Sequence, residues 1–412
     1  MEVKTIFVKT DKRIPCLIYE PPEKSEKSEI AVILMHSDDD YSDFIPAPEL
    51  SKRGYPVFTA HFPNASVTLD EKLEGLHSVV KLAKGQPGIK KILLLGHSGG
   101  ATLMTAYQAV AEKGLSLFRK DSLLIPLKEM EELTPADAVM LLDANFGNGV
   151  MSLLSLDPAV TDETSGLKRD PSLDMLNPEN YTRDEEGHIS FKEAFLKKAL
   201  KAQADRMNRL IAFAQDRLTL IEGGKGYYAD DEPMVIPGGA QVAFCNKFFP
   251  QMTRYFSHTS ERRQLLHADG SLTKEIVPCL REARGMMDAT SRLHGGGRMT
   301  TVKTFLSSMA VRALPDYHFD ETTLYGVDWQ SSYCVTVGNA GYIRVPMLLM
   351  GMTGSYEYIA AEHIFRMAEN CPDKEIAFVE GAGHNFTPIP GQKSCVKACF
   401  DFVDRWIERK MI

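Results

Sequence analysis

Short runs of apolar residues, separated by stretches with helical spacing, set the plan of the first third of the chain. Such runs are typical of strands that are buried on both faces of a parallel sheet. The strands predicted from them span residues 30–35, 55–62, 90–95 and 138–142. Between them, residues 46–53 are predicted as a helix that ends at Gly54, and residues 67–84 show helical periodicity. This alternation predicts an α/β fold with a doubly wound, mostly parallel sheet and helices on both faces.

Segments at the two ends extend the predicted sheet. Residues 2–9 and 13–19 alternate apolar and polar positions around Thr10-Asp11-Lys12, which predicts an antiparallel hairpin. Near the other end, strands and helices alternate again. They are expected over residues 344–350, 361–370, 375–379 and 394–410.

From Asn145 to about Gly341 the alternation of strand and helix stops. This stretch is rich in Asp, Pro and Gly, and it is too long to be a loop within a compact domain. We therefore expect an inserted, mainly helical cap domain. Its helices are predicted over residues 190–220, 275–288 and 301–312. The predicted domains are residues 1–144 (core, first part), 145–341 (cap) and 342–412 (core, second part).

A serine flanked by glycines follows the apolar run at residues 90–95. Gly96, Ser98 and Gly100 form the pattern Gly-x-Ser-x-Gly, and residues 101–110 after it are rich in helix formers. Glycine lets neighbouring backbone approach a sharply turned serine. The amino terminus of the following helix favours the negative charge that forms when a serine attacks an acyl carbon. The pattern predicts a nucleophilic serine at the carboxyl end of a strand.

The strand, turn and helix around Ser98, together with Gly381-Ala382-Gly383-His384, resemble the α/β-hydrolase family. The resemblance covers roughly residues 1–144 and 342–412, and the insertion falls where that family usually has its lid. It implies a serine, acid, histidine triad in that order along the chain. Ser98 would be the nucleophile and His384 the base, because His384 follows the last predicted strand.

The resemblance also implies two backbone donors for an oxyanion. The N–H of Gly99 would be one, and Ser37 or Asp38, after the first buried run, would supply the other. The family usually has His-Gly there, whereas this chain has His36-Ser37 followed by three aspartates at 38–40. Carboxylates beside a developing negative charge are unfavourable, so we expect these three to face solvent.

The acid of the implied triad has two candidates. In most of the family it follows the strand expected here over residues 344–350, but this chain has Gly354 at that position and Glu357 nearby. A minority arrangement places the acid after the preceding strand. There, Leu142-Asp143-Ala144 is similar to the Leu-Asp-Ala of platelet-activating-factor acetylhydrolases. We favour Asp143 as the acid, with Glu357 as the alternative.

Candidates for the substrate pocket are more scattered. They are His36, His97, Trp329 and Tyr356. Each of these residue types is also common in ordinary cores, and His97, inside the serine turn, is expected to pack beneath it. The acidic residues show no metal-ligand spacing, and we expect neither a metal nor a cofactor.

Composition limits the classes of partner. Hydrophobic residues make up 44% and charged residues 25% of the 412, as in soluble globular proteins. The net charge of −8 argues against general affinity for nucleic acid or anionic membrane. We see no apolar run of signal-peptide or membrane-spanning length, and the seven cysteines are scattered, so we expect a cytoplasmic protein with reduced thiols. A homodimer is left open.

The leading interpretation is a serine hydrolase that cleaves a small-molecule acyl compound: a carboxylic ester first, otherwise a lactone, thioester or amide. The cap would wall an apolar pocket over Ser98. The same side chains could serve carbon–carbon bond hydrolysis, acyl transfer or lyase chemistry, which only the products would distinguish. A non-catalytic binding module is a second alternative, and it predicts a spoiled serine turn or a missing histidine.

Overall fold

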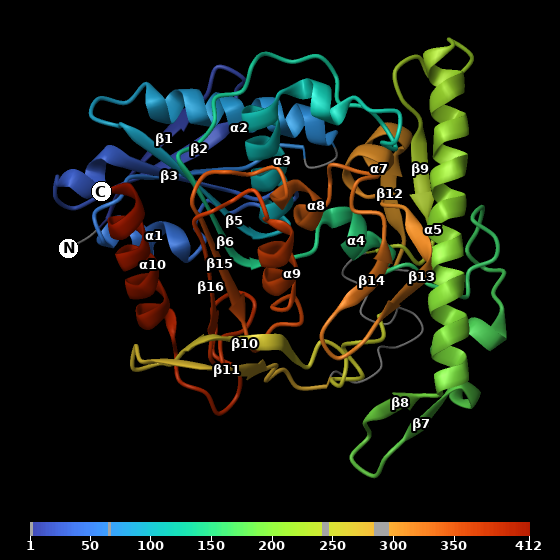
Figure 1. The fold of residues 1–412 in the computed structure, drawn as a ribbon. Coiled ribbons are helices and arrows are strands. Elements are labelled where there is room, and N and C mark those ends of the chain that lie inside the picture. The colour runs from blue at the N-terminus through green and yellow to red at the C-terminus, as the bar shows by residue number, and fades with distance from the viewer. Residues whose placement is uncertain (1–2, 65–66, 241–246, 284–295) are drawn as a thin grey trace.

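One sheet of ten strands forms the centre of the protein (Figure 1). The computed structural model describes residues 3–64, 67–240, 247–283 and 296–412. In order across the sheet, the strands are β1 (Lys4–Lys9), β2 (Pro15–Glu20), β4 (Val57–Ala60), β3 (Ile30–Met35), β5 (Lys91–Ser98), β6 (Ala138–Ala144), β15 (Met347–Met352), β16 (Lys374–Val379), β10 (His258–Leu266) and β11 (Leu272–Pro278).

The middle of the sheet is parallel and its margins are antiparallel. Neighbouring strands from β4 to β10 run parallel, whereas β2 pairs antiparallel with both β1 and β4, and β11 pairs antiparallel with β10. Every residue of β3 and β6 is buried, as expected for strands covered on both faces. The predicted fold class is confirmed, and so is the antiparallel hairpin at the start of the chain.

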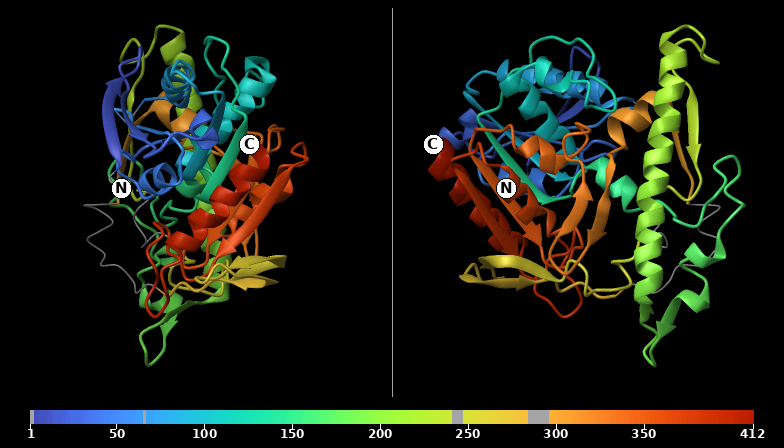
Figure 2. Two further views of the ribbon diagram at one scale, coloured as in Figure 1. Left: turned by 90° about the vertical axis from the view of Figure 1, so that its left-hand side faces the viewer. Right: turned by 45° about the vertical axis from the view of Figure 1, so that its right-hand side comes forward.

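Helices cover both faces of the sheet (Figure 2). One face carries α1 (Pro46–Lys52) and α10 (Val396–Met411). The other carries α2 (Leu69–Lys84), α3 (Gly100–Lys113), α8 (Thr336–Ala340) and α9 (Ala360–Met367). In α10, Phe402 and Trp406 lie one turn apart and are buried, which fixes the face that the helix turns to the sheet. None of the described helices is both long and apolar enough to cross a membrane.

The insertion between β6 and β15 is less helical than predicted. Its main helix is α5 (Glu193–Glu222), close to the predicted range, and α7 (Val302–Ser308) is shorter than predicted. Residues 275–278, predicted as helix, lie in β11, because this β-branched segment pairs with β10; residues 284–288 of that prediction lie outside the described ones. The described part of the insertion also contains three two-stranded antiparallel sheets, besides β10 and β11. They are β7 (Tyr181–Arg183) with β8 (Ile189–Phe191), β9 (Pro233–Ile236) with β12 (Arg298–Thr301), and β13 (Ala313–Phe319) with β14 (Leu324–Val327).

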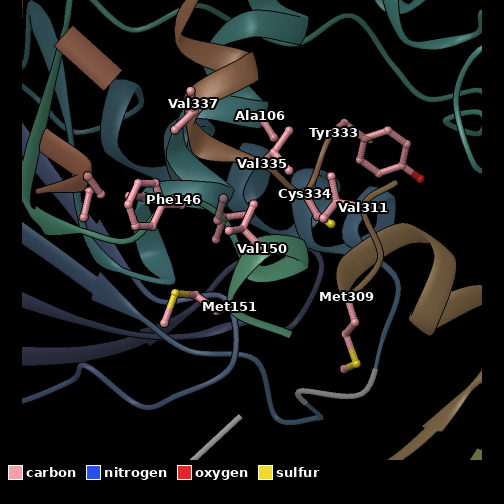
Figure 3. Packing of buried hydrophobic residues seen from close by; sticks show 14 of the residues in the cluster. Ala106, Phe146, Val150, Met151, Met309, Val311, Tyr333, Cys334, Val335 and Val337 are labelled. Carbon is pink, nitrogen blue, oxygen red and sulfur yellow. The ribbon is translucent and has the colours of Figure 1, made fainter. Parts of the chain in front are cut away.

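The insertion packs into the core directly after β6. The short helix α4 (Asn148–Leu153) carries Val150, which lies beside Val335 in one buried cluster (Figure 3). The N–H of Gly149 donates to the carbonyl of Cys334 at 3.2 Å, so the start and the end of the insertion are joined. The six described cysteines form no disulfide.

The predicted domain boundaries assign residues 258–278 to the cap. In the structure, strands β10 and β11 of this segment belong to the main sheet. A buried carboxylate from the core holds the irregular start of β10. Glu362 of α9 accepts hydrogen bonds from the backbone N–H and the hydroxyl of Ser260, at 2.8 and 2.9 Å, and from Arg263 at 2.9 Å. Its side chain is fully buried. The insertion is therefore attached to the core in its middle as well as at its ends.

We expect Glu362→Gln to lower the free energy of unfolding by about 2–4 kcal/mol, because the amide leaves Arg263 without a buried counter-charge and turns a donor toward Ser260. Denaturant unfolding measures this change. Glu261→Gln is the matched control, since Glu261 pairs with the same arginine from an exposed position and should change the free energy by less than about 0.5 kcal/mol. Equal effects of the two substitutions would contradict the role given to Glu362.

Candidate active site

The serine turn lies where β5 meets α3. Ser98 ends β5 with a φ of 50°, in the left-handed region that a residue with a side chain seldom adopts. Glycines make this turn sterically feasible: a Cβ on Gly96 would come within 2.7 Å of the Cα of Ala101, and one on Gly100 within 2.7 Å of the carbonyl of Met35. Ser98 is thus held at the carboxyl edge of the sheet, at the start of a helix.

An aspartate one residue before the end of the neighbouring strand has the same left-handed conformation. Asp143 of β6 has a φ of 47° and is fully buried. One carboxylate oxygen accepts the backbone N–H of Met352 in β15 at 2.8 Å, and the other lies 2.6 Å from Nδ1 of His384. Three consecutive strands of the sheet, β6, β15 and β16, therefore contribute to the position of this imidazole.

His97 fixes the main chain of His384. It is fully buried, and its Nε2 donates to the carbonyl of His384 at 2.7 Å, while the hydroxyl of Tyr41 donates to its Nδ1 at 2.7 Å. Burial holds the pKa of His97 well below its usual value, in keeping with a neutral ring in this tautomer. His97 lies beneath the serine turn, where it was expected to pack, and it is not among the residues that line the pocket at Ser98.

Glu357 lies on the other side of His384. Its Oε2 accepts a weak hydrogen bond from the hydroxyl of Ser98 at 3.4 Å and lies 3.8 Å from Nε2 of His384. Burial alone would lower the pKa of His384, but the Glu357 and Asp143 carboxyls outweigh it and raise this pKa to about 9. Burial raises the pKa of Glu357 itself, and the charges of His384 and Lys247 oppose this rise.

A cavity of about 380 Å³ opens beside Ser98. The predicted residues His36 and Tyr356 line it, and the insertion contributes Lys247 and Arg298. Among the described residues that line the cavity, Met151 has the one aliphatic side chain. The described lining therefore combines carboxylates, cations and amides with apolar surface from Met151 and the rings of Tyr41 and Tyr356, and it is less uniformly apolar than expected.

The order of these residues in the sheet identifies the fold. A serine in a tight turn ends β5, a buried acid lies near the end of β6, and the histidine that it contacts follows β16, all at the carboxyl edge of a parallel sheet. The chain has the α/β-hydrolase fold.

Comparison with protein-family models and with curated protein sequences gives no match. Solved structures with similar folds include the α/β hydrolase GrgF from Penicillium sp. sh18, at 10% identity and a TM-score of 0.46 over 100% of this chain and 99% of that one. A carboxyl esterase from Bacillus coagulans has 10% identity and a TM-score of 0.43 over the full length of both chains. Est1E from Butyrivibrio proteoclasticus has 11% identity and a TM-score of 0.41 over 99% and 98%. The fold assignment depends on strand order and not on these similarities.

The loop after β3, from which the sequence predicts one oxyanion donor, is held by an ion pair with a buried lysine. Nζ of Lys72, on α2, lies 2.9 Å from Oδ1 of Asp38, and the lysine side chain is fully buried. The other carboxylate oxygen accepts from the Ser37 hydroxyl at 2.8 Å and from Nδ2 of Asn148 at 3.0 Å. Desolvation would raise the pKa of Asp38, but the Lys72 ammonium holds it below its usual value.

This network changes the expectation for the aspartates. Asp38 and Asp39 line the pocket and do not simply face bulk solvent, and the Asp38 charge is balanced by Lys72. The N–H of Asp38, one predicted oxyanion donor, donates instead to Nδ1 of His36 at 3.0 Å, and burial lowers the pKa of that histidine to about 4. Gly99 lies against the same loop, since a Cβ there would be 2.9 Å from the Ser37 hydroxyl oxygen. The N–H groups of Gly99 and Ser37 remain the predicted donors.

Trp329 is not part of the pocket at Ser98. It lines a separate hollow of about 140 Å³ with Phe118 and Tyr342. Sequence reasoning also missed Lys72, Asn148, Lys247 and Arg298. Lys72 did leave a signal, since it falls among Leu69, Leu73 and Leu76 on the buried face of α2. The pocket residues of the insertion left none, because nothing in a long irregular stretch shows which part turns toward Ser98.

One group of described side chains could share a cation. Asp184, Glu186 and His188 lie together in the connection between β7 and β8, and all three are exposed. Asp184 already accepts the backbone N–H groups of Glu186 and His188, as in an ordinary turn. None of the three lines the pocket at Ser98.

We expect Lys72→Met to reduce turnover at Ser98 and to lower the free energy of unfolding by about 1–3 kcal/mol, because Asp38 would lose its buried counter-charge. The loss of stability should be smaller than for a fully buried ion pair, since 34% of the Asp38 side chain is exposed and can be solvated. Lys81→Met is the control on the same helix. Lys81 pairs with Asp11 and Glu131 at the surface, so thermal unfolding and turnover should barely change.

Proposed function

We propose that this protein is a serine hydrolase that cleaves small-molecule acyl compounds, with carboxylic esters as the first class to test. The observation that carries the proposal is the 2.6 Å contact between Asp143 and His384, next to a serine held in a left-handed turn. Strain of this kind is retained where it serves a site. The buried carboxylate would keep the His384 proton on Nδ1 and leave Nε2 to act as the base.

The proposed reaction begins with proton transfer from the Ser98 hydroxyl to Nε2 of His384. Ser98 Oγ bonds to the acyl carbon, and the carbonyl oxygen becomes an oxyanion that the N–H groups of Gly99 and Ser37 would stabilise. The imidazolium returns its proton to the leaving group as the carbon–leaving-group bond breaks. Water, deprotonated by His384, then hydrolyses the acyl-enzyme and releases Ser98.

The pocket supports a polar substrate of limited size. A volume of about 380 Å³ limits the length of acyl chain that can fit, and the described lining includes one aliphatic side chain, that of Met151. Carboxylates and cations in the same wall can instead bind hydroxyl, amide or charged groups. Short or polar acyl compounds are therefore the proposed substrates, in place of the apolar chain expected from the sequence.

Carbon–carbon bond hydrolysis, acyl transfer and lyase chemistry use the same residues and would be recognised by their products. A binding module without catalysis has less support, because its expected defects, a spoiled serine turn or a missing histidine, are not found at Ser98 and His384. A cytoplasmic location, a homodimer and the likeness of the acid position to platelet-activating-factor acetylhydrolases stay predictions from the sequence.

We expect a fluorophosphonate probe to add once, at Ser98, with loss of fluoride. Ser98→Ala should abolish this labelling and lower turnover of a responsive ester by roughly four to six orders of magnitude, because the members of a triad act as a unit. Intact-mass measurement counts the adduct, and peptide mapping locates it. Ser42→Ala, which removes a hydroxyl outside the pocket lining, should label normally. An adduct on another serine with Ser98 free would refute the site.

We expect kcat/KM for a series of p-nitrophenyl esters to be highest for acetate or butyrate and to fall for octanoate and longer chains. A wider apolar pocket would instead gain about tenfold or more from a few added methylenes. Initial rates of nitrophenolate release, corrected with Ser98→Ala, make the comparison. A steady rise in kcat/KM with chain length would contradict the polar pocket.

A further inference from the structure

Two carboxyl groups flank the imidazole of His384. Asp143 contacts Nδ1 at 2.6 Å, and Oε2 of Glu357 lies 3.8 Å from Nε2 on the side where Ser98 must deliver its proton. The Ser98 hydroxyl donates to that same Oε2 at 3.4 Å. The structure describes all of these residues. Among them, the Ser98 hydroxyl forms a hydrogen bond with Glu357 and none with His384. The nucleophile and the base thus share a carboxylate partner.

Local hydrogen bonds hold Glu357 in this position. Its N–H donates to the hydroxyl of Ser355 at 3.1 Å, and its carbonyl accepts the N–H of Ala360 at the start of α9, at 2.9 Å. Only 6% of its side chain is exposed. The carboxyl therefore cannot turn out to bulk solvent unless the segment between β15 and α9 moves, and it meets any molecule that reaches Ser98.

The charges around the pair come from several elements. His384 faces Asp143 at the end of β6, Glu357 before α9, the neutral ring of His97 in β5, and His36 after β3. Glu357 faces His384, the more distant Asp143, and Lys247 of the insertion, whose positive charge favours the ionised carboxylate. An ionised Glu357 and a protonated His384 stabilise one another across 3.8 Å in a buried site.

We propose that Glu357 is a fourth catalytic residue, whose carboxylate competes with Ser98 for His384 and thereby sets the pH range in which the site works. The proposal rests on the proposed hydrolase function. The proton of Ser98 can move to His384 only when Nε2 carries none, and Glu357 favours the form in which Nε2 is protonated. As pH rises, the imidazolium releases that proton to solvent. Ser98 Oγ can then bond to the acyl carbon as its own proton passes to Nε2.

The pH range follows from the charges at the two ring nitrogens. Two carboxyls raise the pKa of His384 to about 9, so the neutral base is the minor form at pH 7. The rate should therefore increase through neutral pH and level off above the pKa of His384.

Glu357→Gln tests the proposal, because glutamine keeps the shape of the side chain and an oxygen for the Ser98 hydroxyl but removes the charge. In the pH profile of kcat/KM, we expect the rise on the acidic side (the acid limb) to lie about one pH unit or more lower for the variant than for the parent. At pH 7 the variant should therefore be roughly tenfold faster. At pH 10, where both carry a neutral His384, the two rates should lie within a few-fold of each other.

Two further variants distinguish an effect of the Glu357 charge from a structural effect of the substitution. Asp39→Asn removes a carboxylate from the same pocket wall without touching His384, so it should leave the acid limb in place whatever its effect on rate. Asp143→Asn should lower turnover about a thousandfold or more at every pH, since it removes the partner that orients His384. A Glu357→Gln variant that loses activity at every pH, with an unmoved limb, would overturn the proposal and leave Glu357 a structural residue.

A measurement without substrate distinguishes this inference from the hydrolase proposal. NMR titration of the His384 ring, assigned with His384→Gln, reports its pKa directly in the full chain. A lower pKa in Glu357→Gln than in the parent supports the competition, and an unchanged pKa overturns it. If no ester is cleaved and no fluorophosphonate adds at Ser98, the hydrolase proposal fails while the titration still decides whether Glu357 controls the proton on His384.

Discussion

The left-handed backbone at the ends of two adjacent strands is the constraint on which the rest of the site depends. Ser98 and Asp143 have φ values of 50° and 47°, each costing roughly 1–3 kcal/mol. Ser98 ends β5 and Asp143 is the last residue but one of β6, and these two strands pair with each other. The buried, parallel centre of the sheet holds both turns against that strain. Because both side chains leave the sheet at the same edge, a histidine from one loop can contact the acid and lie close to the serine.

The insertion takes part in this arrangement. Its strand β10 pairs with β16, and the carbonyl of Leu266 accepts the N–H of Glu380, four residues before His384. His267 then contacts the carboxylate of Glu380 at 2.8 Å. The loop that carries the histidine is thus bounded by the core on one side and by the insertion on the other. The insertion helps to position a member of the site in addition to lining the pocket.

The sequence predicted the core well because its strands are buried on both faces and its helices on one, which leaves clear apolar patterns at Ile30–Met35 and Leu69–Lys84. Gly96, Ser98, Gly100 and His384 could be singled out because tight turns restrict residue choice. The return of β10 to the sheet could not be predicted, because His258–Leu266 has three successive charged residues and no run of more than two apolar ones. Nor could the position of Glu357 at the second ring nitrogen, which depends on the path of the segment between β15 and α9.

The place of β10 in the sheet also limits how far the chain could be shortened. Residues 258–278 cover the hydrogen-bonding edge of β16, and the charged strand β11 forms the outer margin on that side. A core stripped of the insertion would expose the apolar residues Ala377, Phe378 and Val379 along an open edge, a surface on which strands of other molecules can add. The insertion therefore protects the sheet from self-association, and a minimal version of this protein would have to retain β10 and β11 even if its pocket were rebuilt.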